Sequence, residues 1–151
     1  MTMKERLDSD LKSAMRDKDV LRRGLIRYLR SEIHNQEIAK RADLDEEGVL
    51  AVLSRQAQQR RDSIEAFKEA DRTDLVDKER AELDIILEYL PQQLSAEEIT
   101  ALVQQAVKDS GATGPSDMGK VMGRLMPQVR GKAEGRQVSS IVTETLKGLI
   151  S

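Results

Sequence analysis

The chain has 151 residues, of which 38% are hydrophobic, 34% are charged and only 2% are aromatic. It contains no cysteine, which excludes a disulfide framework, a thiolate metal site and a cysteine nucleophile. With so few aromatic residues the core must consist of aliphatic side chains, and this composition favours helix over sheet.

The net charge of −2 hides an uneven distribution along the chain. Residues 1–42 hold eleven basic and seven acidic residues, residues 43–94 hold seven and fourteen, and residues 95–151 hold seven and six. The chain as a whole is therefore not a basic protein, and nucleic-acid binding would depend on local basic patches.

Neither a leader nor a membrane segment is expected. The first residues are charged and lack the apolar region of a signal peptide, and no apolar run approaches the length of roughly 18 residues that a transmembrane helix needs. These features favour a cytoplasmic protein without membrane contact.

Apolar residues recur at helical spacing through the first 90 residues. The pattern predicts helices over about residues 2–18, 19–38, 45–70 and 73–90. Asp19 is the expected N-cap of the second helix, Asp43 or Asp45 that of the third, and Thr73 with Asp74 that of the fourth. Pro91 is expected to end the fourth helix.

Residues 91–94 are the expected hinge, and three shorter helices follow. Ser95 and Glu98 form a capping-box pattern at the start of the fifth helix, which should end at Gly111. Ser116 or Thr113 should cap a sixth helix over about 118–129, and a seventh should begin near residue 137. The prediction is an all-α fold: an N-terminal four-helix lobe in residues 1–92 plus a small C-terminal three-helix lobe in residues 93–151.

No catalytic constellation stands out. His34 is the only histidine, so the paired Glu-x-x-His pattern of di-iron bundles cannot form, and an ordinary, partly exposed histidine is expected. The acidic residues lie on the polar faces of periodic helices, and neither a phosphate-binding loop nor a nucleophile elbow is present. We therefore expect no catalytic residue, metal or cofactor.

The strongest candidate site is a basic stretch near the C-terminus. It suits a phosphate backbone because glycines allow close approach and the amides at the start of the seventh helix favour an anion. A solvated turn between two helices is the alternative interpretation. The candidate residues are Lys120, Arg124, Arg130, Gly131, Lys132, Gly135 and Arg136.

Two other stripes have more than one interpretation. Met118, Met122 and Met126 share one face of the sixth helix and are expected to be core, although such a stripe can also be an adaptable binding groove. The second helix carries Arg22 and a row at Arg23, Arg27 and Arg30. These arginines are expected to pair with the acidic residues of 43–94, and the alternative is a surface for nucleic acid or an acidic partner.

Several segments together resemble the GatB/YqeY family, and in order they cover essentially the whole chain. The segments are residues 11–19, 29–35, 59–64, 72–75, 82–83 and 89–94, and the most specific are Asp117-Met118-Gly119-Lys120-Val121-Met122 and Gly131-Lys132-Ala133-Glu134-Gly135. The chain is similar to the free-standing YqeY-like protein rather than to a tail fused to a larger subunit.

The resemblance implies an all-α fold and kinship with the C-terminal tail of GatB, which is one subunit of the glutamine-dependent aminoacyl-tRNA amidotransferase. In that enzyme the tail contacts tRNA, and the chemistry lies in other domains, so the family label of carbon–nitrogen ligase implies no activity of this chain. The resemblance also implies that Lys120, Lys132 and Arg136 face tRNA. Family members often have Arg where this chain has Lys132, which keeps the charge but not the bidentate geometry.

The expected function is therefore a non-catalytic tRNA-binding accessory module, with amidotransferase subunits or an aminoacyl-tRNA synthetase as further partners. The alternative is a protein–protein interaction module without RNA affinity, which would use the methionine stripe or the acidic third and fourth helices.

Overall fold

The computed structural model describes residues 1–150, and these residues form seven α-helices and one short 3-10 helix without any strand. The all-α prediction is confirmed. The chain divides into two compact units, an N-terminal unit, Met1–Leu90, and a C-terminal unit that begins at Pro91. No helix within residues 1–150 combines the length and the apolar character that a membrane span requires.

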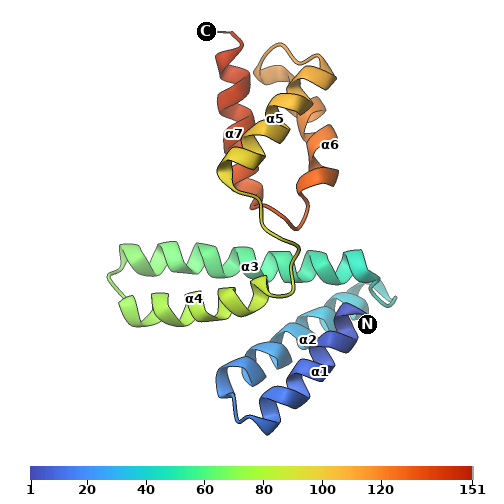
Figure 1. Ribbon diagram of the computed structural model, residues 1–151, viewed down its shortest axis with the longest axis vertical. Helices are drawn as coiled ribbons and strands as arrows, with labels where there is room; N and C mark the ends of the chain where they lie inside the picture. Colours follow the sequence, from blue (N-terminus) through green and yellow to red (C-terminus); the bar gives the residue numbers. More distant parts are fainter. Residues whose placement is uncertain (151) are drawn as a thin grey trace. The chain divides into compact units, whose positions relative to one another are not determined.

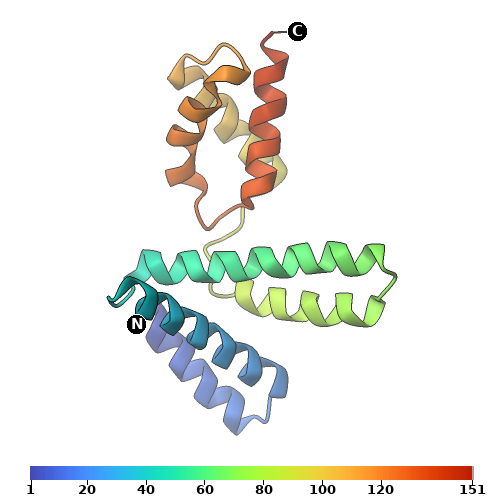
Figure 2. The ribbon, with the colours of Figure 1, turned by 180° about the vertical axis from the view of Figure 1, so that it is seen from behind.

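The N-terminal unit consists of two antiparallel helix pairs (Figures 1 and 2). The first pair is α1 (Met3–Arg16) and α2 (Val20–Lys40), and the second is α3 (Glu46–Glu69) and α4 (Thr73–Leu87). The pairs meet around one aliphatic core, in which Leu7, Ile26, Leu29, Leu53 and Ile86 are fully buried.

The helix starts in this unit follow local capping chemistry. Asp19 accepts a hydrogen bond from the Arg22 amide and Asp45 accepts one from the Gly48 amide, so both expected N-caps are confirmed. The expected cap of α4 is wrong, because Thr73 is already the first helical residue and the preceding Arg72 makes no side-chain cap. Arg72 instead forms an ion pair with Asp74 at 3.1 Å.

The end of α4 differs slightly from the expectation. The α-helix ends at Leu87, and the amides of Glu88, Tyr89 and Leu90 then bond to the carbonyls three residues earlier. The last turn therefore tightens before Pro91, as is common at helix ends. Tyr89 in this turn is buried, and its hydroxyl donates a hydrogen bond to Asp10 while Arg6 lies over its ring at 4.4 Å.

The C-terminal unit consists of three helices, and the chain reverses its direction from each helix to the next (Figure 1). They are α5 (Ala96–Ser110), α6 (Met118–Val129) and α7 (Gly135–Gly148). Its aliphatic core is separate from that of the N-terminal unit. The fully buried residues of this core are Ile99, Val103, Val121, Leu125, Val138, Val142 and Leu146.

The capping box of α5 is confirmed, because Ser95 accepts from the Glu98 amide and Glu98 accepts from the Ser95 amide. The expected cap of α6 is wrong. A 3-10 turn, Pro115–Asp117, precedes this helix, and Thr113 donates both its amide and its hydroxyl to Asp117 instead of capping. The helix α7 begins at Gly135, two residues earlier than expected.

Candidate nucleic-acid interface

The candidate cations occupy two neighbouring parts of the C-terminal unit. Lys120 and Arg124 lie one turn apart on α6 and form what we call the α6 pair. Arg130, Lys132 and Arg136 belong to the basic loop, which we define as residues 130–136 between α6 and the first turn of α7. All five side chains are exposed.

The two parts are separated along the length of α6. Ten residues separate Lys120 from Arg130, which corresponds to about 15 Å along a helix with a rise of 1.5 Å per residue. Gly119 and Gly123 are also exposed, and apart from their chain neighbours and the backbone of α6 itself no atom lies within 4 Å of the place where a Cβ would stand on either. The surface beside the α6 pair is therefore open to close approach by an extended ligand.

The path of the basic loop is set by backbone hydrogen bonds. Gly131 has a φ of 77°, in the left-handed region that glycine adopts without strain. The amides of Lys132 and Ala133 then both donate to the Val129 carbonyl, at 2.8 and 3.1 Å. This turn reverses the chain between α6 and α7 and leaves the charged side chains in solvent.

The segment before α5 closes the other side of the loop. The Leu94 amide donates to the Lys132 carbonyl at 2.8 Å, and the Gln93 side chain donates to the Gly131 carbonyl at 2.9 Å. Sequence reasoning missed Gln93, since its partner lies 38 residues away and no local pattern indicates it.

Two carboxylates accompany the five cations. Asp117 lies 3.8 Å from the Lys120 ammonium, and the hydrogen bond from the Thr113 amide is the main reason why the pKa of Asp117 lies below its usual value. Asp117 is therefore ionised at neutral pH and partly offsets the charge of Lys120. Glu134 is the N-cap residue of α7, with an extended backbone and no side-chain cap. The balance of charge in this region remains positive.

The methionine stripe is part of the core region, as expected. Met118, Met122 and Met126 are all partly buried, and they pack against the core of the C-terminal unit. The stripe is therefore not an open groove, which removes one of the two surfaces considered for protein binding.

The arginines of α2 are partly paired within the N-terminal unit. Arg22 contacts Glu88 at 3.0 Å, as the expected pairing with residues 43–94 requires, whereas Arg30 contacts Asp8 of α1 at 2.9 Å. Arg27 contacts the Met15 sulfur at 3.9 Å. Within residues 1–150 the structure shows no carboxylate within 4.0 Å of Arg23 or Arg27, so only part of this strip is neutralised internally.

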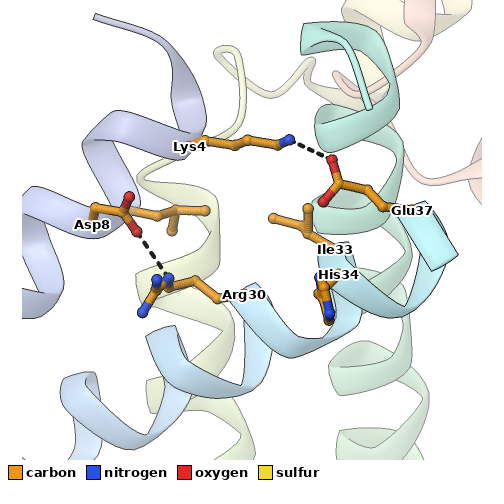
Figure 3. Close-up of a pocket in the computed structure, with 7 residues that line it drawn as sticks. Lys4, Asp8, Arg30, Ile33, His34 and Glu37 are labelled. Carbon is orange, nitrogen blue, oxygen red and sulfur yellow. Dashed lines mark hydrogen bonds and ion pairs between the residues drawn. The ribbon is translucent and has the colours of Figure 1, made fainter. Parts of the chain in front are cut away.

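A pocket of about 280 Å³ lies between α1 and α2 in the N-terminal unit (Figure 3). Its lining residues are Lys4, Leu7, Asp8, Arg30, Ile33, His34 and Glu37. Figure 3 shows Lys4 reaching Glu37 and Arg30 reaching Asp8, so the charges of the walls neutralise one another. The Lys4 ammonium and the Leu44 amide hold the pKa of Glu37 below its usual value. His34 is exposed at the edge of this pocket.

A buried polar cluster in the N-terminal unit was not predicted. Arg60 is only 9% exposed and donates to the Gln56 side chain at 2.5 Å, and its guanidinium lies 3.9 Å from Glu82. The ring of Tyr28 lies 5.3 Å from the same guanidinium. Gln56 and Arg60 are four residues apart in α3 and fall at positions of the helical period that the apolar residues of this helix occupy. This spacing was the signal in the sequence that could have indicated their burial.

The acidic residues do not form a metal site. Within residues 1–150, no group of three His, Asp or Glu side chains is arranged to hold a metal ion.

The fold and the site define a class: an all-α protein of two helical units, with exposed cations along α6 and the basic loop. Residues 4–146 match the family described as Yqey-like protein, so the chain belongs to this family. The resemblance found in the sequence is thereby confirmed.

The relatives include proteins named "Altered inheritance of mitochondria protein 41, mitochondrial". The protein from Pyrenophora tritici-repentis is 33% identical over 93% of this chain and 79% of its own length. Those from Lachancea thermotolerans and Kluyveromyces lactis are 43% and 41% identical, over 73% and 79% of this chain. The chain spans 60% and 66% of the length of these two relatives.

These names correct one expectation. The sequence favoured a cytoplasmic protein, but the relatives are named as mitochondrial proteins, which contradicts that prediction. Its basis was weak, since the lack of an apolar leader tests for secretion and not for other destinations.

Proposed function

We propose that this protein is a non-catalytic tRNA-binding accessory module, and that its C-terminal unit makes the contact. The observation that supports this most directly is the set of five exposed cations along α6 and the basic loop, next to an exposed glycine backbone. Phosphate groups are recognised by such exposed lysine and arginine side chains together with backbone amides.

The mode of binding follows from what the C-terminal unit lacks. The aromatic residues of the chain are Tyr28, Phe67 and Tyr89, all before Pro91, so the C-terminal unit has no ring on which a base could stack. Recognition would then rest on the phosphate backbone and on the shape of the folded RNA. The first amides of α7, at the positive end of the helix dipole, add to the attraction for anions.

The proposal is tested with the full chain and total tRNA at low salt. Reversing the charge at Lys132 and Arg136, in the double variant Lys132→Glu, Arg136→Glu, should abolish binding, because two attractive contacts become repulsive. Lys132→Glu alone is compared with the matched control Lys108→Glu, which reverses one charge of the same kind in the last turn of α5, away from the basic loop. Absence of binding by the wild-type protein at low salt would refute the proposal, as would equal losses in Lys132→Glu and Lys108→Glu.

The family kinship extends the proposal to partners. We propose that the protein acts beside an enzyme that modifies or charges tRNA, either amidotransferase subunits or an aminoacyl-tRNA synthetase. Capture of such a partner with the tagged chain should decrease after nuclease treatment if tRNA bridges the two. Capture that is insensitive to nuclease and to salt would indicate a direct protein contact.

A second candidate function is direct protein binding through α2. Val20, Leu21 and Tyr28 are 66%, 39% and 44% exposed, and Gly24 between them has no neighbour within 4 Å of its Cβ position. These residues make an open apolar strip, which fits an amphipathic helix of a partner better than the packed methionine stripe does. Leu21→Asp should weaken partner capture without changing the affinity for tRNA.

A further inference from the structure

The side chain of Gln93 joins two distant parts of the C-terminal unit. Its Nε2 donates to the Pro91 carbonyl at 2.8 Å and to the Gly131 carbonyl at 2.9 Å. The next residue adds a backbone bond, from the Leu94 amide to the Lys132 carbonyl at 2.8 Å. Residues 93 and 94 therefore hold two consecutive carbonyls of the basic loop.

These bonds matter because of the flexibility of the loop. Glycine has the largest conformational freedom of any residue type, and the residues after Gly131 carry exposed charges. The two turn bonds to the Val129 carbonyl fix the amides of Lys132 and Ala133, but they leave the carbonyls of Gly131 and Lys132 without a partner inside the loop. Gln93 and Leu94 supply those partners.

The bonds also affect the electrostatics of the loop. A carbonyl oxygen is the negative end of the peptide dipole, so a carbonyl turned toward the ligand would repel a phosphate. Donors at positions 93 and 94 hold the oxygens of Gly131 and Lys132 toward the segment before α5. The loop can then present its cationic side chains without exposing these two oxygens.

We propose that Gln93 is a positioning residue for anion binding by the basic loop. It does not touch the RNA; it holds the Gly131 carbonyl and so prepares the loop for the phosphate groups that the side chains contact. A loop that is ordered before binding loses less conformational freedom when the ligand arrives. This role rests on the proposed tRNA binding.

The test uses the full chain with Gln93→Met, which keeps an unbranched side chain of similar length and removes the donor. Gln93→Asn is the second variant, because it keeps the amide but shortens its reach. The control is Gln92→Met, at an exposed neighbouring position for which the structure shows no side-chain hydrogen bond. Two quantities are measured: amide hydrogen exchange at Leu94 and Lys132, and affinity for total tRNA over a series of salt concentrations.

Both Gln93 variants should exchange faster at Leu94 and Lys132 than the wild type. They should bind tRNA about threefold to tenfold more weakly, the range expected for loss of one neutral hydrogen bond. The salt dependence should stay unchanged, because the number of phosphate contacts is the same, whereas loss of a phosphate-contacting lysine reduces the salt slope by about one. Gln92→Met should match the wild type in exchange, affinity and salt slope.

The outcomes separate the two proposals. Unchanged exchange in both Gln93 variants would overturn the positioning role whatever the RNA result. Faster exchange with wild-type affinity would also overturn it, and the tRNA proposal would stand. A reduced salt slope in Gln93→Met would show that a cationic phosphate contact has been lost, which contradicts the prediction that the loop keeps its contacts and would overturn the proposed role. Failure of the wild-type protein to bind tRNA at low salt would overturn the proposed function and the positioning role together.

Discussion

The salt dependence of tRNA binding gives the sharpest test of the proposed interface, because the proposal names five exposed cations as the phosphate contacts. Each phosphate that a lysine or arginine neutralises releases counterions, and the slope of log affinity against log salt changes by about 0.7 for single strands and about 0.9 for duplex DNA. With the α6 pair and the three cations of the basic loop engaged, the slope should lie between about −3.5 and −4.5.

This slope corresponds to a large change in affinity. Raising the salt from about 50 to about 200 mM should weaken binding roughly 130- to 500-fold. Lys132→Ala should make the slope less steep by about 0.7 to 0.9, because Lys132 is exposed and no carboxylate of the described residues lies within 4.0 Å of it. Lys120→Ala should have a smaller effect, since Asp117 at 3.8 Å already offsets part of the charge of Lys120.

The assay is a binding titration of fluorescently labelled total tRNA at four or more salt concentrations. Lys108→Ala is the matched control, because it removes one exposed lysine from the last turn of α5. Its slope should equal that of the wild type. A slope near zero for the wild type, or an equal change for Lys132→Ala and Lys108→Ala, would refute the assignment of the phosphate contacts to the α6 pair and the basic loop.

Three further predictions concern stability and are tested by urea unfolding. Burial and the nearby Glu82 raise the pKa of Glu79. The folded state therefore binds this proton more tightly than the unfolded chain, and the free energy of unfolding falls as the pH rises through the folded pKa. Glu79→Gln should thus be more stable than the wild type at pH 7 and show less of this fall; equal pH dependence of the two would contradict the assignment. Leu125→Ala, at a fully buried position, should lower the free energy of unfolding by about 2–5 kcal/mol. Its control, Leu149→Ala, lies at a position that is 47% exposed and should change the free energy of unfolding by no more than about 0.5 kcal/mol. Similar effects of the two substitutions would argue against the C-terminal core. Ser95→Ala should lower the free energy of unfolding by about 1 kcal/mol, because α5 loses its N-cap. An unchanged urea midpoint would show that the cap contributes nothing to stability.

The helices could be predicted well because their signals are local. Asp19, Asp45 and Ser95 each lie next to the amides that they cap, so three or four residues of sequence contain the whole interaction. The prediction was wrong at α6, where Thr113 bonds to Asp117 and the 3-10 turn at Pro115 takes the place of a cap. Two capping residues within reach of one another can bond to each other, and sequence alone does not show which bond forms.

Contacts between helices were the part that sequence could not supply. The pairing of Arg30 with Asp8 rather than with the acidic third and fourth helices depends on how α1 packs against α2. The burial of Arg60 between Gln56 and Glu82 depends on how α3 packs against α4. Helical periodicity indicates which face is buried, but it does not specify the residue on the opposite helix.

The candidate site could be predicted in part, because some of its features depend on local sequence and others on contacts between distant residues. The exposure of Lys120 and Arg124 follows from the helical period of α6, which places them away from Val121 and Leu125. The basic loop is also bonded by Gln93, which no spacing rule connects with Gly131.

The basic loop also keeps its shape and its charge on different residues. Its path is set by uncharged groups: the left-handed Gly131, the Val129 carbonyl and the donors at positions 93 and 94. Its charge lies on exposed side chains. Replacing Lys132 by another polar residue therefore changes the affinity for anions and leaves the fold nearly as stable, whereas any side chain at residue 131 would meet the strain of a positive φ. If the loop binds RNA as proposed, single surface substitutions in related chains can adjust the affinity while the backbone of the loop stays the same.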